Sequence, residues 1–241
     1  MNLPAVPAPA SAPADSRSRI LAAALRVIRA QGYAASTVDA LCAEAGVNKG
    51  SFFHHFSSKE DMALEAVAHW NRVTGERFAK APFQRLEDPR ERVLAYIDFR
   101  RGLLRGNAAD FSCLLGTLVQ EVHASHPRLR EACNAGIRLH ACTVERDLAA
   151  AKALYAPQAD WEPRALALFT QAALQGAFIL AKAQGSAAAA ASCVDHLRRH
   201  VAQLLGADGP GAPPAPAGRT ARSAGARARK STRIASTPPP R

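Results

Sequence analysis

Apolar residues recur every three or four positions along most of the chain, and this spacing predicts helices rather than strands. The first predicted helix covers about residues 16–31 and ends at Gly32, a residue suited to a helix C-terminus. Ile20, Ala24 and Ile28 lie on its apolar face. No stretch alternates Val, Ile, Thr or Tyr as a half-buried strand does. The pattern therefore predicts an all-α protein with about nine helices.

Capping residues, prolines and glycines delimit the other predicted helices. Ser36 and Asp39 have the spacing of a capping box, which predicts the start of the second helix. Asp88 and Pro89 have the N-cap and first-turn proline pattern of a later helix. The helices predicted after the first cover about residues 36–45, 49–54, 59–80, 89–105, 110–124, 127–155, 162–185 and 187–205.

Residues 36–60 hold two short predicted helices that meet at a glycine, followed by an aromatic and basic run and another helix. This order is typical of a helix-turn-helix unit, whose second helix lies in the DNA major groove. Gly46 permits the tight turn, and Gly50 lets the backbone approach DNA closely. The residues predicted to form the apolar core of the unit are Leu41, Ala45, Val47, Phe52 and Phe56. Those left to face outward or edge-on are Lys49, Ser51, Phe53, His54 and His55.

The net charge of +11 is unevenly distributed and suits a polyanionic partner such as nucleic acid. The tail at 207–241 carries seven basic residues and one acid. That tail and the Pro/Ala-rich segment 1–14 hold too little apolar surface to fold, so both are predicted to be disordered. Between them we expect a DNA-binding domain at 15–60 and a helical regulatory and dimerisation domain at 61–206.

The sequence shows no pattern of catalytic or metal-binding chemistry, and we expect no cofactor and no enzymatic activity. The five cysteines are odd in number and lack C-x-x-C spacing, which argues against a zinc site or a disulfide framework. His54 and His55 are adjacent, and adjacent helical residues point in directions that disfavour joint binding of one metal ion. We expect no signal peptide and no membrane span.

The segment TVDALCAEAGVNKGSFFHHFSSKEDM, residues 37–62, resembles the DNA-binding signature of the TetR/AcrR family of transcriptional regulators. The matching features are a threonine that opens the second helix, A-G-V at the turn, K-G-S, an aromatic pair, H-F, and a lysine that opens the fourth helix. The match covers about residues 17–65. It implies an N-terminal three-helix helix-turn-helix domain, followed by a helical domain for ligand binding and dimerisation.

The resemblance also implies roles for individual residues. The DNA-contacting set would be Thr37, Asn48, Lys49, Gly50, Ser51, Phe53, His54, His55 and Lys59. In that set Thr37 caps the second helix and touches a phosphate, and Lys59 contacts phosphate at the start of the fourth. Phe53 departs from the family pattern, which usually has tyrosine there. Phenylalanine keeps the packing and loses the hydroxyl that would bind a phosphate.

The last two predicted helices, about 162–185 and 187–205, would form the dimer interface of the resembled family. Small residues along the first of them allow two helices to approach closely. These are Ala172, Ala173, Gly176, Ala177 and Ala181. Ordinary packing within one chain is the alternative explanation for them.

Two later segments, FSCLLGTLVQEVH at 111–123 and QGAFILAKAQG at 175–185, resemble a subgroup that includes NemR-like and AcuR-like regulators. In that subgroup a cysteine and a lysine from these segments line a pocket for electrophiles or small ligands, and the matching residues are Cys113 and Lys182. An ammonium near a thiol favours the reactive thiolate. The alternative is a structural Cys113 and a Lys182 that extends to solvent.

The combined prediction is a homodimeric repressor in the bacterial cytoplasm, associated with the nucleoid, that binds a pseudo-palindromic operator in duplex DNA. A small-molecule or electrophilic effector would release it from DNA. One alternative is an architectural, non-specific DNA binder whose basic tail supplies most of the affinity. Another is a helical enzyme or metalloprotein, for which the chain shows no convergent ligand spacing.

Overall fold

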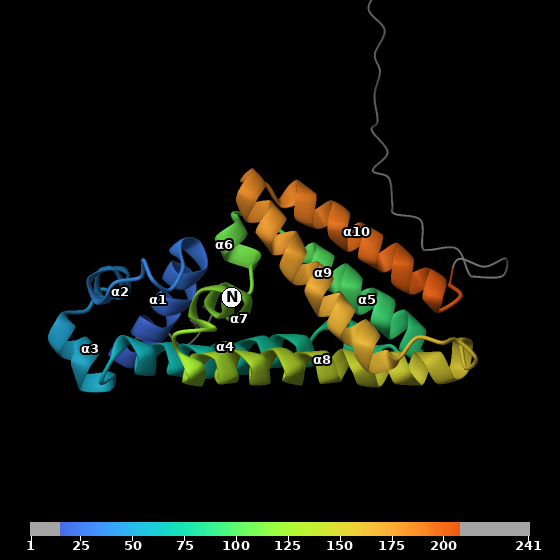
Figure 1. The fold of residues 1–241 in the computed structure, drawn as a ribbon, viewed down its shortest axis with the longest axis horizontal. Coiled ribbons are helices and arrows are strands. Elements are labelled where there is room, and N and C mark those ends of the chain that lie inside the picture. The colour runs from blue at the N-terminus through green and yellow to red at the C-terminus, as the bar shows by residue number, and fades with distance from the viewer. Residues whose placement is uncertain (1–14, 208–241) are drawn as a thin grey trace, which may run out of the picture. The chain divides into compact units, whose positions relative to one another are not determined.

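The computed structural model describes residues 15–207, which form ten α-helices and one 3₁₀ helix without any strand (Figure 1). The all-α prediction is confirmed. The segment 1–14 and the tail, apart from Ala207, lie outside the described residues, and so does their predicted disorder. The elements are α1 (Ser16–Gln31), α2 (Val38–Ala45), α3 (Lys49–His55), α4 (Lys59–Ala79), η1 (Pro82–Arg85), α5 (Pro89–Gly102), α6 (Ala108–Phe111), α7 (Leu114–Val122), α8 (Pro127–Tyr155), α9 (Pro163–Gln184) and α10 (Ala187–Leu204).

Two predicted caps are confirmed and one is wrong. Asp88 caps α5, with Pro89 in its first turn, as the sequence indicates. The capping box of Ser36 does not form. Its hydroxyl donates to the carbonyl of Gly32 at 2.5 Å, and the side chain is buried there. Thr37 caps α2, as the resemblance implies, because its Oγ1 accepts the backbone N–H of Ala40 at 3.1 Å.

The helix predicted over residues 110–124 is two helices, α6 and α7, and this raises the number of α-helices from the expected nine to ten. Ser112 and Cys113 interrupt it in extended conformation, with ψ of 157° and 127°. The guanidinium of Arg29 stabilises the break, because its Nη1 donates to the carbonyl oxygens of Asp110 (3.0 Å) and Ser112 (3.5 Å). Cys113 therefore directly precedes α7 rather than lying inside a helix.

The buried apolar residues form two clusters. The first is contributed by α1 to α4, α7 and the first half of α8. The second is contributed by η1, α5, the second half of α8, α9 and α10. The long helices α4 and α8 pack along each other (Figure 1). Because the first cluster continues beyond residue 60 into α7 and α8, the helix-turn-helix unit shares its core with helices of the C-terminal half.

Helix α9 is long and apolar enough, by length and composition alone, to cross a membrane. In this structure it packs against α8 and α10, and it buries the polar side chains of Thr170 and Gln171. The Oγ1 of Thr170 donates to the carbonyl of Leu166 at 2.9 Å. These contacts are those of a core helix in a helical bundle.

Candidate DNA-binding surface and ligand cavities

Side-chain caps set the geometry of the helix-turn-helix unit. Asn48 Oδ1 accepts the N–H of Ser51 at 2.8 Å and starts α3. Ser58 Oγ accepts the N–H of Asp61 at 3.0 Å and starts α4. Gly46 ends α2 with φ of 63°, a left-handed conformation that glycine adopts at little cost. The short helices therefore have their free backbone groups bound locally, as such isolated turns require.

Helix α3 has a buried apolar side and an exposed polar start. Phe52 is fully buried, and Phe56 packs beside it with ring centroids 5.6 Å apart. Val47 is only partly buried, whereas the other members of the predicted core are buried. Phe53 points the other way, with 54% of its surface exposed. The predicted assignment of inward and outward residues on α3 is therefore confirmed in its main features.

The exposed start of α3 carries a cation that is paired on the surface. Lys49 Nζ lies 2.9 Å from Asp39 Oδ1 of α2, with both side chains more than half exposed. The hydrogen bond to that carboxylate and its charge raise the pKa of Lys49. Asn48, Gly50 and His54 are exposed beside it, as is Thr37 at the start of α2.

Two members of the predicted DNA-contacting set are half-buried and are bound by other parts of the chain. Lys59 Nζ donates to the carbonyl oxygen of Tyr33 at 3.0 Å and lies 4.2 Å from the centroid of its ring. Partial burial lowers the pKa of Lys59. A hydrogen bond of 2.6 Å joins His55 Nε2 to Ser16 Oγ on α1. Both side chains therefore fasten α3 and α4 to the first helix and the loop after it.

A basic residue of α1 reaches the turn of the unit. Arg19 is exposed, and its Nη1 donates to the carbonyl oxygen of Gly46 at 3.3 Å. The sequence analysis did not single it out, because it lies on the first helix, before the signature segment at residues 37–62.

Cys113 and Lys182 line one solvent-open cavity of about 350 Å³ between α1, α7 and α9. The Lys182 ammonium donates to Thr117 Oγ1 at 3.1 Å rather than to the thiol. Partial burial lowers the pKa of Lys182, the charge of Arg29 lowers it further, and Glu121 and Cys113 oppose the shift. The structure brings the predicted pair to the same cavity without joining them by a hydrogen bond.

Glu121 connects this cavity to the helix-turn-helix unit. It lines the cavity from α7, and its carboxylate accepts the backbone N–H groups of Tyr33 (3.0 Å) and Ala34 (2.8 Å) in the loop before α2. Gly32 has φ of 86°, and a Cβ there would collide with the same carboxylate. The loop is therefore fitted closely around a side chain that comes from the C-terminal half.

A second, internal cavity of about 290 Å³ is lined by α1 and α4 to α9. Three arginines line it: Arg29, Arg77 and Arg100. Cys113, Gln175 and Phe178 line both this cavity and the solvent-open one. The sequence did not indicate it, because its residues come from helices far apart in the chain.

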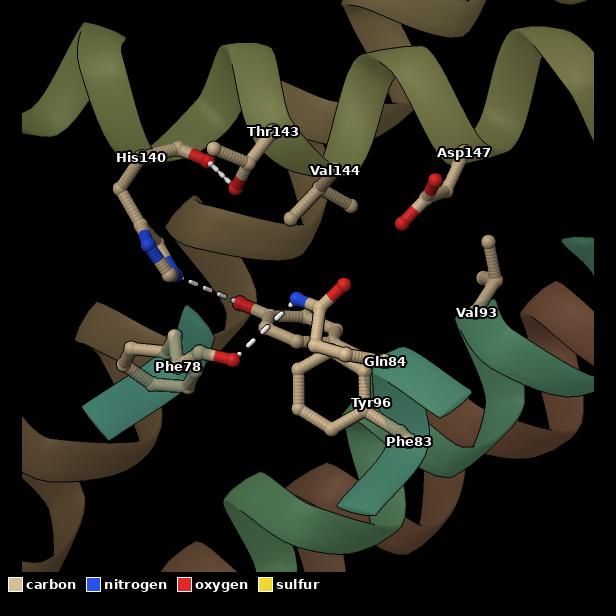
Figure 2. Close-up of a pocket in the computed structure, with 9 residues that line it drawn as sticks. All are labelled: Phe78, Phe83, Gln84, Val93, Tyr96, His140, Thr143, Val144 and Asp147. Atoms are coloured by element: carbon tan, nitrogen blue, oxygen red, sulfur yellow. Dashed lines mark hydrogen bonds between the residues drawn. The ribbon is translucent and has the colours of Figure 1, made fainter. Parts of the chain in front are cut away.

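A third space, of about 20 Å³, lies next to the internal cavity and has room for about one water molecule. Figure 2 shows its lining residues, with His140 of α8 directed at the hydroxyl of Tyr96, 2.9 Å away. Burial, aided by the charge of Arg100, lowers the pKa of His140 to about 3, so the imidazole is neutral. This space is too small for an effector. Within residues 15–207 no group of three or more His, Cys, Asp or Glu side chains is arranged to hold a metal ion.

The fold and this surface define the class: a helix-turn-helix unit that shares its core with a cavity-bearing helical half. The chain belongs to the TetR family of DNA-binding transcriptional regulators. The model for bacterial regulatory proteins of the tetR family matches residues 20–66, and the tetracyclin repressor-like C-terminal domain model matches residues 89–197.

Three comparisons illustrate the relationship. The chain is 31% identical over 142 residues to the HTH-type transcriptional regulator LmrA of Bacillus subtilis, which covers 56% of this chain and 71% of LmrA. It is 29% identical over 173 residues to the transcriptional regulator AcuR of Cereibacter sphaeroides, which covers 68% of this chain and 74% of AcuR. The solved structure of the TetR-family regulator CifR with operator DNA has a TM-score of 0.64 at 21% identity, and covers 77% of this chain and 96% of that chain. That last similarity concerns the fold.

Proposed function

We propose that this regulator is a homodimeric repressor in the bacterial cytoplasm, at the nucleoid, and that an effector bound between α1, α7 and α9 releases it from operator DNA. The observation that carries the proposal is the position of Glu121. One carboxylate lines the cavity that holds Cys113 and Lys182 and also binds the loop before α2. A ligand that moved α7 would therefore move the start of the DNA-binding helices, as coupling between two sites requires.

The exposed residues around the start of α3 are the proposed DNA contacts. Small and polar groups there leave the backbone accessible to the floor of the groove. The set is Thr37, Asn48, Lys49, Gly50, Ser51, Phe53 and His54. In this proposal His55 and Lys59 act by holding the helices in place, because both bind groups of the first helix or its following loop. Arg19 adds a cation near a phosphate at the turn.

The proposed dimer is supported by the outer side of α9. Leu168, Phe169, Ile179 and Leu180 recur at helical spacing, and each is 44% to 48% exposed. Such a stripe on one helix suits a second copy of the same chain. A dimer also presents two recognition helices to a pseudo-palindromic operator. Light scattering after size-exclusion chromatography should give a dimer for the wild type and a monomer for Phe169→Glu, with Leu154→Glu, an exposed leucine of α8, as the control.

DNA binding is tested with genomic fragments recovered by the protein and then measured by fluorescence anisotropy. Lys49→Ala should weaken binding to the recovered operator at least tenfold, because it removes a charge at the base-reading end of α3. The matched control is Lys80→Ala, which removes an exposed lysine directly after the C-terminal end of α4. A chain that ends at residue 207 should keep operator preference and lose only salt-dependent, non-specific affinity. If that chain lost all binding, the protein would be an architectural binder.

The sensing role of Cys113 is tested with N-ethylmaleimide, which alkylates thiolates. Treatment should release DNA from the wild type and from Cys142→Ser, which removes an exposed thiol outside both cavities. Cys113→Ser should stay bound. Burial and the nearby Cys113 raise the pKa of Cys133 to about 12, so Cys133 does not compete for the reagent. Equal release of all three proteins would show that Cys113 is not the sensor.

A further inference from the structure

The internal cavity gathers positive charge in an otherwise apolar space. Leu25, Trp70, Phe111, Ile137 and Phe178 are among its walls. Arg29, Arg77 and Arg100 come from α1, α4 and α5 and line the same space. Arg29 and Arg100 are half-buried and Arg77 is exposed. Placing a guanidinium group among apolar side chains is unfavourable unless it gains polar or ionic partners. The partners of the three arginines therefore show what the cavity lacks.

Arg29 is held by the backbone and by an aromatic face. Its Nε donates to the carbonyl of Leu25 at 2.7 Å, its Nη1 donates to the two carbonyls at the α6–α7 break, and its guanidinium lies 5.1 Å from the Trp70 ring. No hydrogen bond from Nη2 is found among the described residues. Burial lowers the pKa of Arg29, the charge of Asp110 opposes that shift, and the charge of Arg77 adds to it. The side chain is therefore fixed in position, and no carboxylate oxygen of the described residues lies within salt-bridge distance of it.

Arg100 lies between two aromatic rings. Its guanidinium is 5.3 Å from the centroid of Phe78 and 5.8 Å from that of Phe178. Its Nη1 lies 3.4 Å from His140 Nε2, which also receives the Tyr96 hydroxyl. An arginine can only donate, so this nitrogen of the neutral imidazole is the acceptor. Within the described part of the chain, Arg100 thus has aromatic and neutral partners and no anionic one.

The acidic content of the cavity is small. Among the described residues Asp110 is the one carboxylate in its lining, and its Oδ2 already accepts the backbone N–H of Asn107. Within residues 15–207, none of the three arginines has a carboxylate oxygen within salt-bridge distance. Arginine is the side chain best suited to bind a carboxylate through two parallel hydrogen bonds.

We propose that the internal cavity binds an organic monocarboxylate with an apolar body, and that its carboxylate is held by Arg100 and Arg77 with Arg29 nearby. The aromatic and aliphatic walls take the apolar body, and the cavity volume suits a ligand of about one aromatic ring or a medium-length acyl chain. The inference rests on the proposed function in one respect: binding of the acid is what would change DNA affinity.

Isothermal titration calorimetry on the full-length protein without DNA tests the binding itself. The probes are phenylacetate and octanoate, each compared with its neutral amide. The wild type should bind at least one acid roughly tenfold or more tighter than the amide, because a charge-assisted pair is lost in the amide. Arg100→Gln and Arg77→Gln should each lower the affinity for the acid by about tenfold and leave amide binding unchanged. Arg101→Gln, which removes an exposed arginine of α5 paired with Asp195, should behave as the wild type.

Two results would overturn the proposal: acid and amide binding equally well, or no saturable binding of either acid to the wild type. Unchanged acid affinity in both cavity variants would overturn it as well. Arg77→Gln is the variant least expected to disturb folding, because the Arg77 side chain is exposed and makes no hydrogen bond among the described residues. Operator anisotropy, measured separately, distinguishes the two proposals. Acid binding without operator binding contradicts the repressor, and operator binding without acid binding contradicts this inference.

Discussion

The helix-turn-helix surface and the internal cavity use cations in opposite ways. Lys49 is exposed and already has a carboxylate partner, Asp39, only one short helix away. Arg29 and Arg100 are half-buried against aromatic rings, and no carboxylate lies within salt-bridge distance of either among the described residues. An exposed pair can exchange its partner for a DNA phosphate at small cost. A partly buried cation without an anionic partner favours a ligand that brings a negative charge.

The two neighbouring phenylalanines of α3 separate folding from recognition, and they carry the largest predicted effect. Phe52→Ala should reduce the free energy of unfolding by about 3–5 kcal/mol, because it empties a fully buried site in the first cluster. Phe53→Ala should cost less than about 1 kcal/mol, because the ring is 54% exposed. Urea denaturation followed by circular dichroism measures both.

Under conditions in which Phe52→Ala and Phe53→Ala are both folded, the loss of operator affinity should be larger for Phe53→Ala, the reverse of the order in stability. Phe53→Ala should then weaken binding more than its stability cost explains. Phe53→Tyr should strengthen it, because a hydroxyl at this exposed position can donate to a phosphate. Equal stability costs for Phe52→Ala and Phe53→Ala would show that α3 does not have the inner and outer sides described here.

How much the sequence could predict differs between these two regions. The DNA-binding unit lies within one continuous stretch, and its caps, its turn glycine and its inward phenylalanines follow from local chemistry. Even there Ser36 was misassigned, because its partner, the carbonyl of Gly32, depends on the path of the loop. The break at Ser112 could not be predicted, since it depends on Arg29, which lies 83 residues away in the chain. The arginine-lined cavity likewise needs helices that meet only in the folded protein.

The half-buried imidazole of His140, between the internal cavity and the small space beside it, predicts a pH dependence. Burial lowers the pKa of His140 from 6.5 to about 3, so the unfolded chain binds a proton there between those pH values and the native protein does not. Stability is therefore unaffected above pH 6.5 and is lost as the pH falls towards 3, by at most about 1.4 kcal/mol per pH unit.

Urea denaturation at pH 7, 6, 5 and 4 measures this dependence. The comparison is His140→Gln, which keeps a hydrogen-bonding group and cannot titrate. The difference in stability between wild type and variant should shift in favour of the variant as the pH falls. A stability difference that did not change with pH would mean that His140 binds a proton as readily in the native protein as in the unfolded chain. The partners assigned to Arg100 would then be wrong.

The start of α2 is bound by the local side chain of Thr37, and the loop before it is bound by the distant side chain of Glu121. This offers a smaller, sharper contrast. Thr37→Ala removes the local cap and should cost about 1 kcal/mol of stability, whereas Thr37→Ser should cost little. Glu121→Gln weakens the distant acceptor for Tyr33 and Ala34, with a stability cost of similar size, about 1 kcal/mol. The two variants should differ in how N-ethylmaleimide affects them. The reagent should still release DNA from Thr37→Ala, and it should release less DNA from Glu121→Gln. If both variants responded as the wild type does, Glu121 would not be the connection between cavity and DNA-binding unit.

Asp39→Asn should have the smallest effect on stability and a clear effect on DNA binding. The Asp39 carboxylate forms an ion pair with the Lys49 ammonium, and it also repels phosphates near the start of α3. Its removal should tighten operator binding severalfold at low salt, and the gain should shrink as salt screens the charges. Glu44→Gln is the matched control, because it removes one negative charge from the same helix while its partner is Arg26 on α1. If Glu44→Gln tightened binding as much, the gain would come from net charge alone. A larger gain for Asp39→Asn would instead mean that Lys49 reaches DNA by exchanging a surface carboxylate for a phosphate, which the partly buried arginines of the cavity cannot do.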